Sequence, residues 1–179
     1  MKTLKRLGFT AFTALALVLT ACSGSDDGGG GSSLDTYISA KVDGVQFTTS
    51  SYQGQSVGIA TRSGSGEFET IIVNCSNLTS PTATDFHSMS VALVGVSAPG
   101  TYEVNSSTNT TLGYIEATAA TGNVSWDTGD YAGVSGTITV TTLTANKVEG
   151  TFSFTGAKDD ECTNHKVVTN GSFRGTFAN

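Results

Sequence analysis

Two short stretches of the chain carry residue types that hydrolases use. The stretch Gly54-Gln-Ser56-Val-Gly58 has the spacing of a nucleophile elbow, which works only where a strand turns sharply into a helix. No helical pattern follows Ser56, so we do not expect a catalytic serine there. Asp127-Thr128-Gly129 has the spacing found in aspartic proteases, but their site needs two such carboxylates and the chain has one copy. Asp and Gly favour turns, so these residues predict a turn, and no catalytic residue is predicted.

Four neighbouring residues, Trp126, Asp127, Asp130 and Tyr131, are our candidates for a ligand surface. Trp126 is the only tryptophan of the chain, and its exposure decides the interpretation. An exposed ring would favour stacking on a glycan, whereas a buried ring would be part of the core, which is the interpretation we favour.

Acidic residues offer a second interpretation of the same region. Asp127 with Asp130, or the run Asp159-Asp160-Glu161, supplies oxygen ligands of the kind calcium prefers. The alternate acids of a calcium-binding loop are absent, and runs of acids are usually solvated. We therefore predict neither a metal site nor a cofactor.

The three cysteines fall into two groups. Cys22 lies at the end of the N-terminal apolar segment, which leaves Cys75 and Cys162 as an even pair in the rest of the chain. In an exported domain such a pair predicts a disulfide, and two free thiols are the alternative. A zinc site is less favoured, because the two histidines, His87 and His165, would have to complete it.

Residues 1–21 have the pattern of a signal peptide. Lys2, Lys5 and Arg6 precede an uncharged, mostly apolar run that is short for a membrane span. Leu19-Thr20-Ala21-Cys22 resembles the lipobox of bacterial lipoproteins. The resemblance implies cleavage before Cys22 and acylation of that cysteine, and several acyl chains on one residue give a stable membrane anchor.

Residues 22–33 follow as a Gly, Ser and Asp linker without apolar side chains. Asp26 and Asp27, close to Cys22, resemble the acidic surface-export signal of Bacteroidota lipoproteins. That resemblance implies an outer-membrane protein facing the cell exterior. The alternative is that the two acids only keep the linker soluble. Without residues 1–21 the chain has 6 basic and 15 acidic side chains, so we predict no nucleic-acid partner.

Residues 34–179 show alternating apolar and polar positions rather than helical periodicity. We expect Asp43-Gly44 and Ala145-Asn146 to be hairpin turns, and a strand from Glu67 to Cys75. The C-terminal pattern is the clearest, with one set of positions expected to face one way: Val167, Thr169, Gly171, Phe173, Gly175 and Phe177. The similar motifs at residues 150–154 and 171–177, in which Phe alternates with small or polar residues, predict adjacent strands with matching aromatic residues.

The expected fold is all-β, a single antiparallel β-sandwich or flattened β-barrel of about ten strands. Four features together resemble a family of small Bacteroidota cell-surface lipoproteins of uncharacterised function. They are the lipobox, Ala40-Lys-Val-Asp-Gly-Val-Gln-Phe47, Gly100-Thr-Tyr102, and the pair Val148-Glu-Gly-Thr-Phe-Ser-Phe154 with Thr169-Asn-Gly-Ser-Phe173. The resemblance implies a β-rich envelope domain and no catalytic residues.

Three functions remain open on this basis. The first is a non-catalytic surface domain that binds a glycan, a peptide or an outer-membrane protein. The second is a structural or assembly subunit of an outer-membrane complex. The third, less favoured, is a glycan- or peptide-directed hydrolase.

Overall fold

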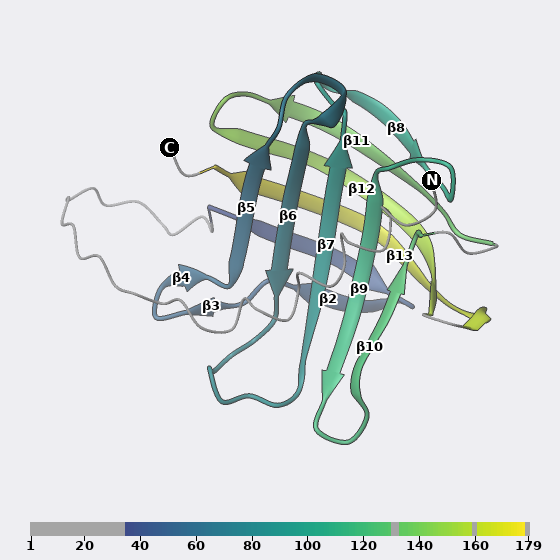
Figure 1. Ribbon diagram of the computed structural model, residues 1–179. Coiled ribbons are helices and arrows are strands. Elements are labelled where there is room, and N and C mark those ends of the chain that lie inside the picture. Colours follow the sequence, from purple (N-terminus) through teal and green to yellow (C-terminus); the bar gives the residue numbers. More distant parts are fainter. Residues whose placement is uncertain (1–34, 130–132, 159–160, 178–179) are drawn as a thin grey trace. The chain divides into compact units, whose positions relative to one another are not determined.

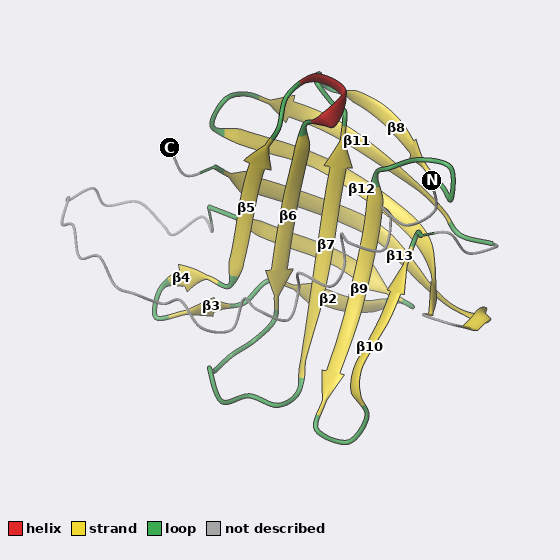
Figure 2. Cartoon of the chain, viewed as in Figure 1, coloured by secondary structure: helices red, strands yellow, loops and turns green. Residues whose placement is uncertain are grey.

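The structure, a computed structural model, describes residues 35–129, 133–158 and 161–177, and of Glu161 and Cys162 it describes the backbone alone. Most of these residues are in strands, and they include one short 3-10 helix, η3 (Gly66–Phe68), in a connection (Figure 2). All strand pairs are antiparallel. The prediction of an all-β antiparallel fold is therefore confirmed.

The strands in chain order are β1 (Tyr37–Val42), β2 (Val45–Thr48), β3 (Ser51–Tyr52), β4 (Gln55–Ser56), β5 (Gly58–Ser63), β6 (Thr70–Ser76), β7 (Phe86–Val94), β8 (Gly100–Val104), β9 (Thr111–Thr118), β10 (Gly122–Asp127), β11 (Ser135–Leu143), β12 (Lys147–Lys158) and β13 (Glu161–Thr176). Within the described residues no helix has the length and apolar character needed to cross a membrane.

Eleven of these strands form one sheet, and β3 pairs with β4 as a separate hairpin. The main path of the sheet runs β2-β1-β13-β12-β10-β9-β7-β6-β5, and β11 joins β12 to β8 beside it. The sheet curls so that β5 and β6 lie against β1 and β13 (Figure 1). A side chain added at Gly175 of β13 would meet Ala60 and Val73, which shows how closely the two halves pack.

One apolar core fills the space between the two halves of the curled sheet. The alternation of the strands sends every second side chain inward, which is the arrangement that buries one face of an antiparallel sheet. Its largest fully buried side chains are Phe173, Ile38, Ile71, Met89, Leu93, Leu112, Ile138, Val73, Val91, Val104, Val140 and Val148.

Both predicted hairpin turns are confirmed. Asp43 and Gly44 have φ angles of 49° and 84° and connect β1 to β2, as a two-residue turn with positive φ requires. Ala145 and Asn146 lie between β11 and β12.

The C-terminal strands confirm the prediction of adjacent strands with matching aromatic residues. Strands β12 and β13 pair along most of their length, and Phe152 and Phe173 are both buried with ring centroids 6.2 Å apart. Rings at this separation stabilise a core beyond their buried area.

Two expectations about strands are wrong. Glu67 lies in η3 rather than at the start of a strand, and β6 begins at Thr70. In β13, the inward set changes at Asn170, which has a φ of 52° and lies where the pairing with β1 shifts register. After it Gly171 and Phe173 are buried as predicted, but before it Val168 is buried and Val167 exposed. A β-bulge therefore reverses the two faces of the first half of β13.

Candidate functional site

The reversal in β13 brings one lysine to the inner face of the sheet. Lys166 lies over β9 and β10, beside the β1–β2 turn, and contacts two carboxylates and two aromatic rings. We call this group, which consists of Lys166, Glu116, Asp43, Tyr114 and Trp126, the Lys166 cluster.

The ammonium group of Lys166 is held from several directions. Its Nζ is 2.9 Å from Glu116 Oε1 and 3.5 Å from Asp43 Oδ2. The same nitrogen is 4.7 Å from the ring centroid of Trp126 and 5.8 Å from that of Tyr114. Cations bind aromatic faces within about 6 Å of the ring centroid, so both rings contribute to holding the charge.

The electrostatics of the cluster favour a charged lysine and a neutral tyrosine. Burial by itself lowers the pKa of Lys166, but the hydrogen bond and charge of Glu116 and the charge of Asp43 outweigh it, so the pKa is raised. Burial and then the negative charge of Glu116 raise the pKa of Tyr114 well above its ordinary value. The Tyr114 hydroxyl donates to Glu116 Oε1 at 3.3 Å, which fits a protonated phenol beside a carboxylate.

Neighbouring strands fix the members of the cluster. Tyr114 packs edge-on against Phe47 and His87, with ring centroids 6.4 Å and 5.6 Å away. Trp126 Nε1 donates to Asn164 Oδ1 at 3.3 Å. The side chain of Lys166 remains 20% exposed, so solvent reaches the cluster from outside.

The two described members of the predicted ligand surface, Trp126 and Asp127, are both buried. Trp126 is only 6% exposed, because Lys166 covers its face and Tyr114 lies beside it with ring centroids 6.1 Å apart. The core interpretation of this ring is therefore the correct one. Asp127 is also buried, and its Oδ1 accepts a hydrogen bond from the Gly129 N–H at 2.7 Å, as the predicted turn requires. Asp130 and Tyr131 lie outside the described residues.

Ser56 occupies a local structure unlike that of a nucleophile elbow. It belongs to the two-residue strand β4 and is followed by β5, not by a helix. Its hydroxyl donates to the carbonyl oxygen of Thr36, which ties the start of β1 to this hairpin.

The structure corrects the expected disulfide between Cys75 and Cys162, because Cys75 is a free, buried thiol. Its sulfur contacts Thr49 and the backbone of Ile38, which pairs with Phe173 of β13. The backbone of Cys162 lies near the start of the same strand, at the residue after Glu161.

We expect Cys75 to be protected from thiol reagents in the folded protein. Burial raises the pKa of its thiol from 9.0 to about 12, which lowers its thiolate content at pH 8 by about a thousandfold. In a chain carrying Cys22→Ser and Cys162→Ser, labelling should be slow in buffer and fast in denaturant. Equal rates in both solvents would contradict the buried position.

The same shift has a consequence for stability at alkaline pH. The unfolded thiol ionises near pH 9 and the folded one only near pH 12. The stability that protonated Cys75 contributes is therefore complete below pH 9 and is lost as the pH rises toward 12.

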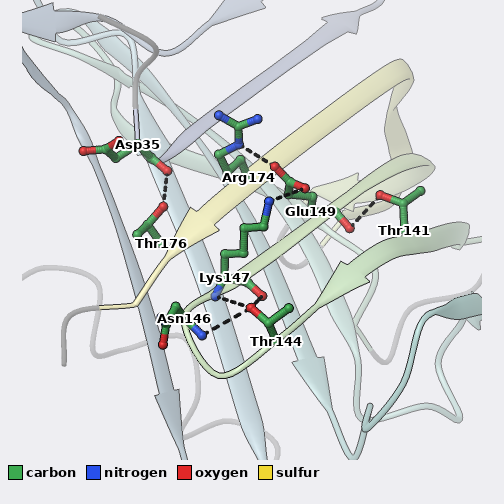
Figure 3. Close-up of polar contacts among 8 residues, drawn as sticks. All are labelled: Asp35, Thr141, Thr144, Asn146, Lys147, Glu149, Arg174 and Thr176. Carbon is green, nitrogen blue, oxygen red and sulfur yellow. Dashed lines mark hydrogen bonds and ion pairs between the residues drawn. The ribbon is translucent and has the colours of Figure 1, made fainter. Parts of the chain in front are cut away.

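A second polar group lies at the β11–β12 turn and on the neighbouring strands (Figure 3). Glu149 lies between Lys147 and Arg174, at 3.1 Å from Lys147 Nζ and 2.7 Å from Arg174 Nε. The hydrogen bond from Lys147 lowers the pKa of Glu149 most, burial opposes the shift, and Arg174 adds to it. These contacts hold β12 and β13 together at their outer surface, and the Thr142 side chain adds a hydrogen bond to Glu149 from β11.

Comparison with known proteins gives no match. No protein-family model, no curated protein and no solved structure matches the chain. The site must therefore be interpreted from its own geometry.

The geometry of the Lys166 cluster is suited to holding a cation. Both of its carboxylates and both of its ring faces point at the same ammonium nitrogen. Among residues 35–129, 133–158 and 161–177, no group of three or more His, Cys, Asp or Glu side chains lies close enough to hold a metal ion. Asp159 and Asp160, which we considered as calcium ligands, lie outside these residues.

Sequence reasoning singled out Trp126 and did not identify Lys166, Glu116 or Asp43 as members of a site. Tyr114 and Glu116 are two positions apart in β9 and so share its inner face. The sequence shows this pattern as a charged residue at a position where the alternation predicts an apolar one. Lys166 gave no such signal, because the bulge at Asn170 places it on the face opposite to the one that the alternation predicts.

Proposed function

We propose that this chain is a lipid-anchored protein of the cell envelope whose folded domain binds a partner and does not catalyse a reaction. The lipobox at Leu19-Thr20-Ala21-Cys22 and the linker of residues 22–33 support the anchor. Asp26 and Asp27 support a position in the outer membrane facing the cell exterior. The curled sheet fits a flattened barrel better than a sandwich, because β10 and β12 pair and so continue the sheet from one half to the other.

The observation that carries the binding role is the Lys166 cluster. Charged and aromatic groups from three segments that are far apart in the sequence converge there. The cluster is partly exposed to solvent. A few polar groups converging among apolar and aromatic side chains are typical of ligand sites. A glycan, a peptide or an outer-membrane protein remains the proposed class of partner.

The anchor is tested by growing a Gram-negative host that expresses the full chain with radiolabelled palmitate. We expect the chain to take up label and to sediment with the membranes. The Cys22→Ala variant should carry no label and keep its signal peptide. Label on Cys22→Ala, or none on the original chain, would contradict the anchor. Loss of protease accessibility on intact cells in an Asp26→Ala, Asp27→Ala variant would support the surface-export role of these acids.

A second candidate function, an assembly subunit of an outer-membrane complex, is favoured by the free edge of β5. This strand ends the sheet path, and a groove of about 560 Å³ lies along it, lined partly by Thr36, Ala145 and Phe177. Unpaired strand edges accept a strand from another chain. If the chain is an assembly subunit, it should co-purify with an outer-membrane protein in stoichiometric amount.

That candidate is tested by a substitution at the free edge. Ser76 N–H bonds to the Val57 carbonyl, so by alternation the N–H of Ala60 points away from β6 and toward the groove. Ala60→Pro should therefore remove an edge donor without breaking the β5–β6 ladder and should abolish the co-purification. Unchanged co-purification would exclude β5 as the assembly edge.

A further inference from the structure

The Lys166 cluster has the composition of a receptor for an organic cation. Two carboxylates supply charge, and two aromatic rings supply faces that attract a cation after it has lost part of its hydration. The bound group in this structure is the side chain of the protein's own lysine, with its Nζ 2.9 Å from Glu116 Oε1 and 4.7 Å from the Trp126 centroid.

We propose that this cluster is a binding site for a primary alkylammonium group, which Lys166 fills from within the chain and which an amine-bearing ligand takes when the Lys166 side chain turns into solvent. The inference rests on the binding role proposed above and names the chemical class of the ligand.

The walls of the site are separate from their occupant. Glu116 and Tyr114 come from β9, Trp126 from β10 and Asp43 from the β1–β2 turn, whereas Lys166 comes from β13. Removing the lysine side chain therefore leaves the walls on strands that are fixed by other contacts.

Those other contacts hold Asp43, Tyr114 and Glu116 in place. Asp43 Oδ1 accepts the Val167 N–H at 2.9 Å, and its own N–H donates to the Val167 carbonyl at 2.8 Å. Tyr114 packs on Phe47 and donates its hydroxyl to Glu116. None of these contacts involves the ammonium group.

Lys166 is also able to leave without a change in the fold. Its backbone pairs with Gly156 in β12, and its side chain is a flexible four-carbon stem that is 20% exposed. Rotation about side-chain torsions is enough to carry the ammonium group into solvent.

The resident lysine sets the affinity that a ligand must exceed. A tethered group competes at an effective concentration of millimolar or more, so a simple amine with no other contacts should bind the intact chain poorly. Removal of the Lys166 side chain leaves the carboxylates of Glu116 and Asp43 without their cation. Because these negative charges are partly buried, the site then favours binding of another cation.

The test uses the full chain with Lys166→Ala and n-butylammonium chloride, at constant ionic strength maintained with sodium chloride. Trp126 is the only tryptophan, so its fluorescence reports on the site directly. We expect a saturable fluorescence change in Lys166→Ala, with an apparent affinity about a hundredfold or more above that of the intact chain. A rise in melting temperature with butylammonium should accompany it.

Three controls separate the proposed chemistry from general effects. Lys41→Ala removes an exposed lysine of β1 and should behave like the intact chain. n-Butanol has the same alkyl chain without the charge and should give no saturable change. Lys166→Ala combined with Glu116→Gln should lose most of the affinity for butylammonium, because Glu116 supplies the shortest contact to the nitrogen.

A folded Lys166→Ala variant without a saturable response to butylammonium would overturn the inference, and so would an equal response to butanol. If Lys166→Ala does not fold alone, butylammonium should restore its β-sheet circular dichroism, and absence of that recovery would count against the site. Failure here would leave the palmitate result at Cys22 unaffected, so the amine site and the lipid anchor fail separately.

Discussion

Gly150→Ala should destabilise the domain by about 3 kcal/mol or more, a large part of the 5–15 kcal/mol that stabilises a typical domain. A Cβ atom at this position of β12 would overlap the carbonyl oxygen of Thr139 and lie 2.8 Å from a ring carbon of Phe173. Neither neighbour is able to move freely, because Thr139 belongs to the paired strand β11 and Phe173 is 1% exposed in the core. Urea denaturation of purified protein measures the effect as a lower midpoint.

Gly100→Ala is the matched control for this substitution. Gly100 also lies in a strand, β8, but the nearest atoms to an added Cβ there belong to the Tyr102 side chain, at 3.4 Å or more. Such contacts are ordinary, so the midpoint should change little or rise slightly through the lower entropy of the unfolded chain. Equal midpoints for the two variants would show that Gly150 is not confined as the structure describes.

Phe173→Ala should cost about 3–5 kcal/mol, the range measured when a large aromatic side chain is removed from a core. Phe173 is the largest fully buried side chain of the described residues. It packs on Phe152 and pairs with Ile38 of β1, so the cavity would lie where three strands meet. Thermal and urea unfolding should both report the loss.

Phe68→Ala makes the same chemical change at the surface. Phe68 lies in η3 and is 83% exposed. Little of its apolar surface is buried in the folded protein, so its removal loses almost no buried apolar area. Its unfolding midpoint should stay close to that of the original chain. A large loss at Phe68, or a small one at Phe173, would contradict the arrangement of the core.

Local patterns in the sequence were enough to predict much of the fold. Asp43-Gly44 adopts the positive φ angles that a two-residue hairpin needs, and few other residue pairs do so without strain. The alternation in β12 places Val148, Phe152 and Phe154 in the core as expected. These features depend on neighbours in the chain, which sequence reasoning reaches directly.

The remaining features depend on contacts between distant segments. Cys75 faces Ile38 and Thr49 across the core, and nothing near Cys75 in the sequence indicates that its partner is not Cys162. The Lys166 cluster combines residues of β9, β10, β13 and the β1–β2 turn, and their meeting depends on strand order. The bulge at Asn170 adds a one-residue shift, and such a shift exchanges the two faces of a strand.

The pairing of β1 with β13 joins the first strand of the described chain to the last. A chain that is still growing from its N-terminus can pair β1 with β2 at once, but it lacks the second neighbour of β1 until β13 has been made. Sheets built from pairings of such high contact order fold slowly, over milliseconds to seconds, because a long loop must close before the contact forms. Strand β13 also pairs with β12, so the last of the described strands to be synthesised is the one that joins β1 to the rest of the sheet.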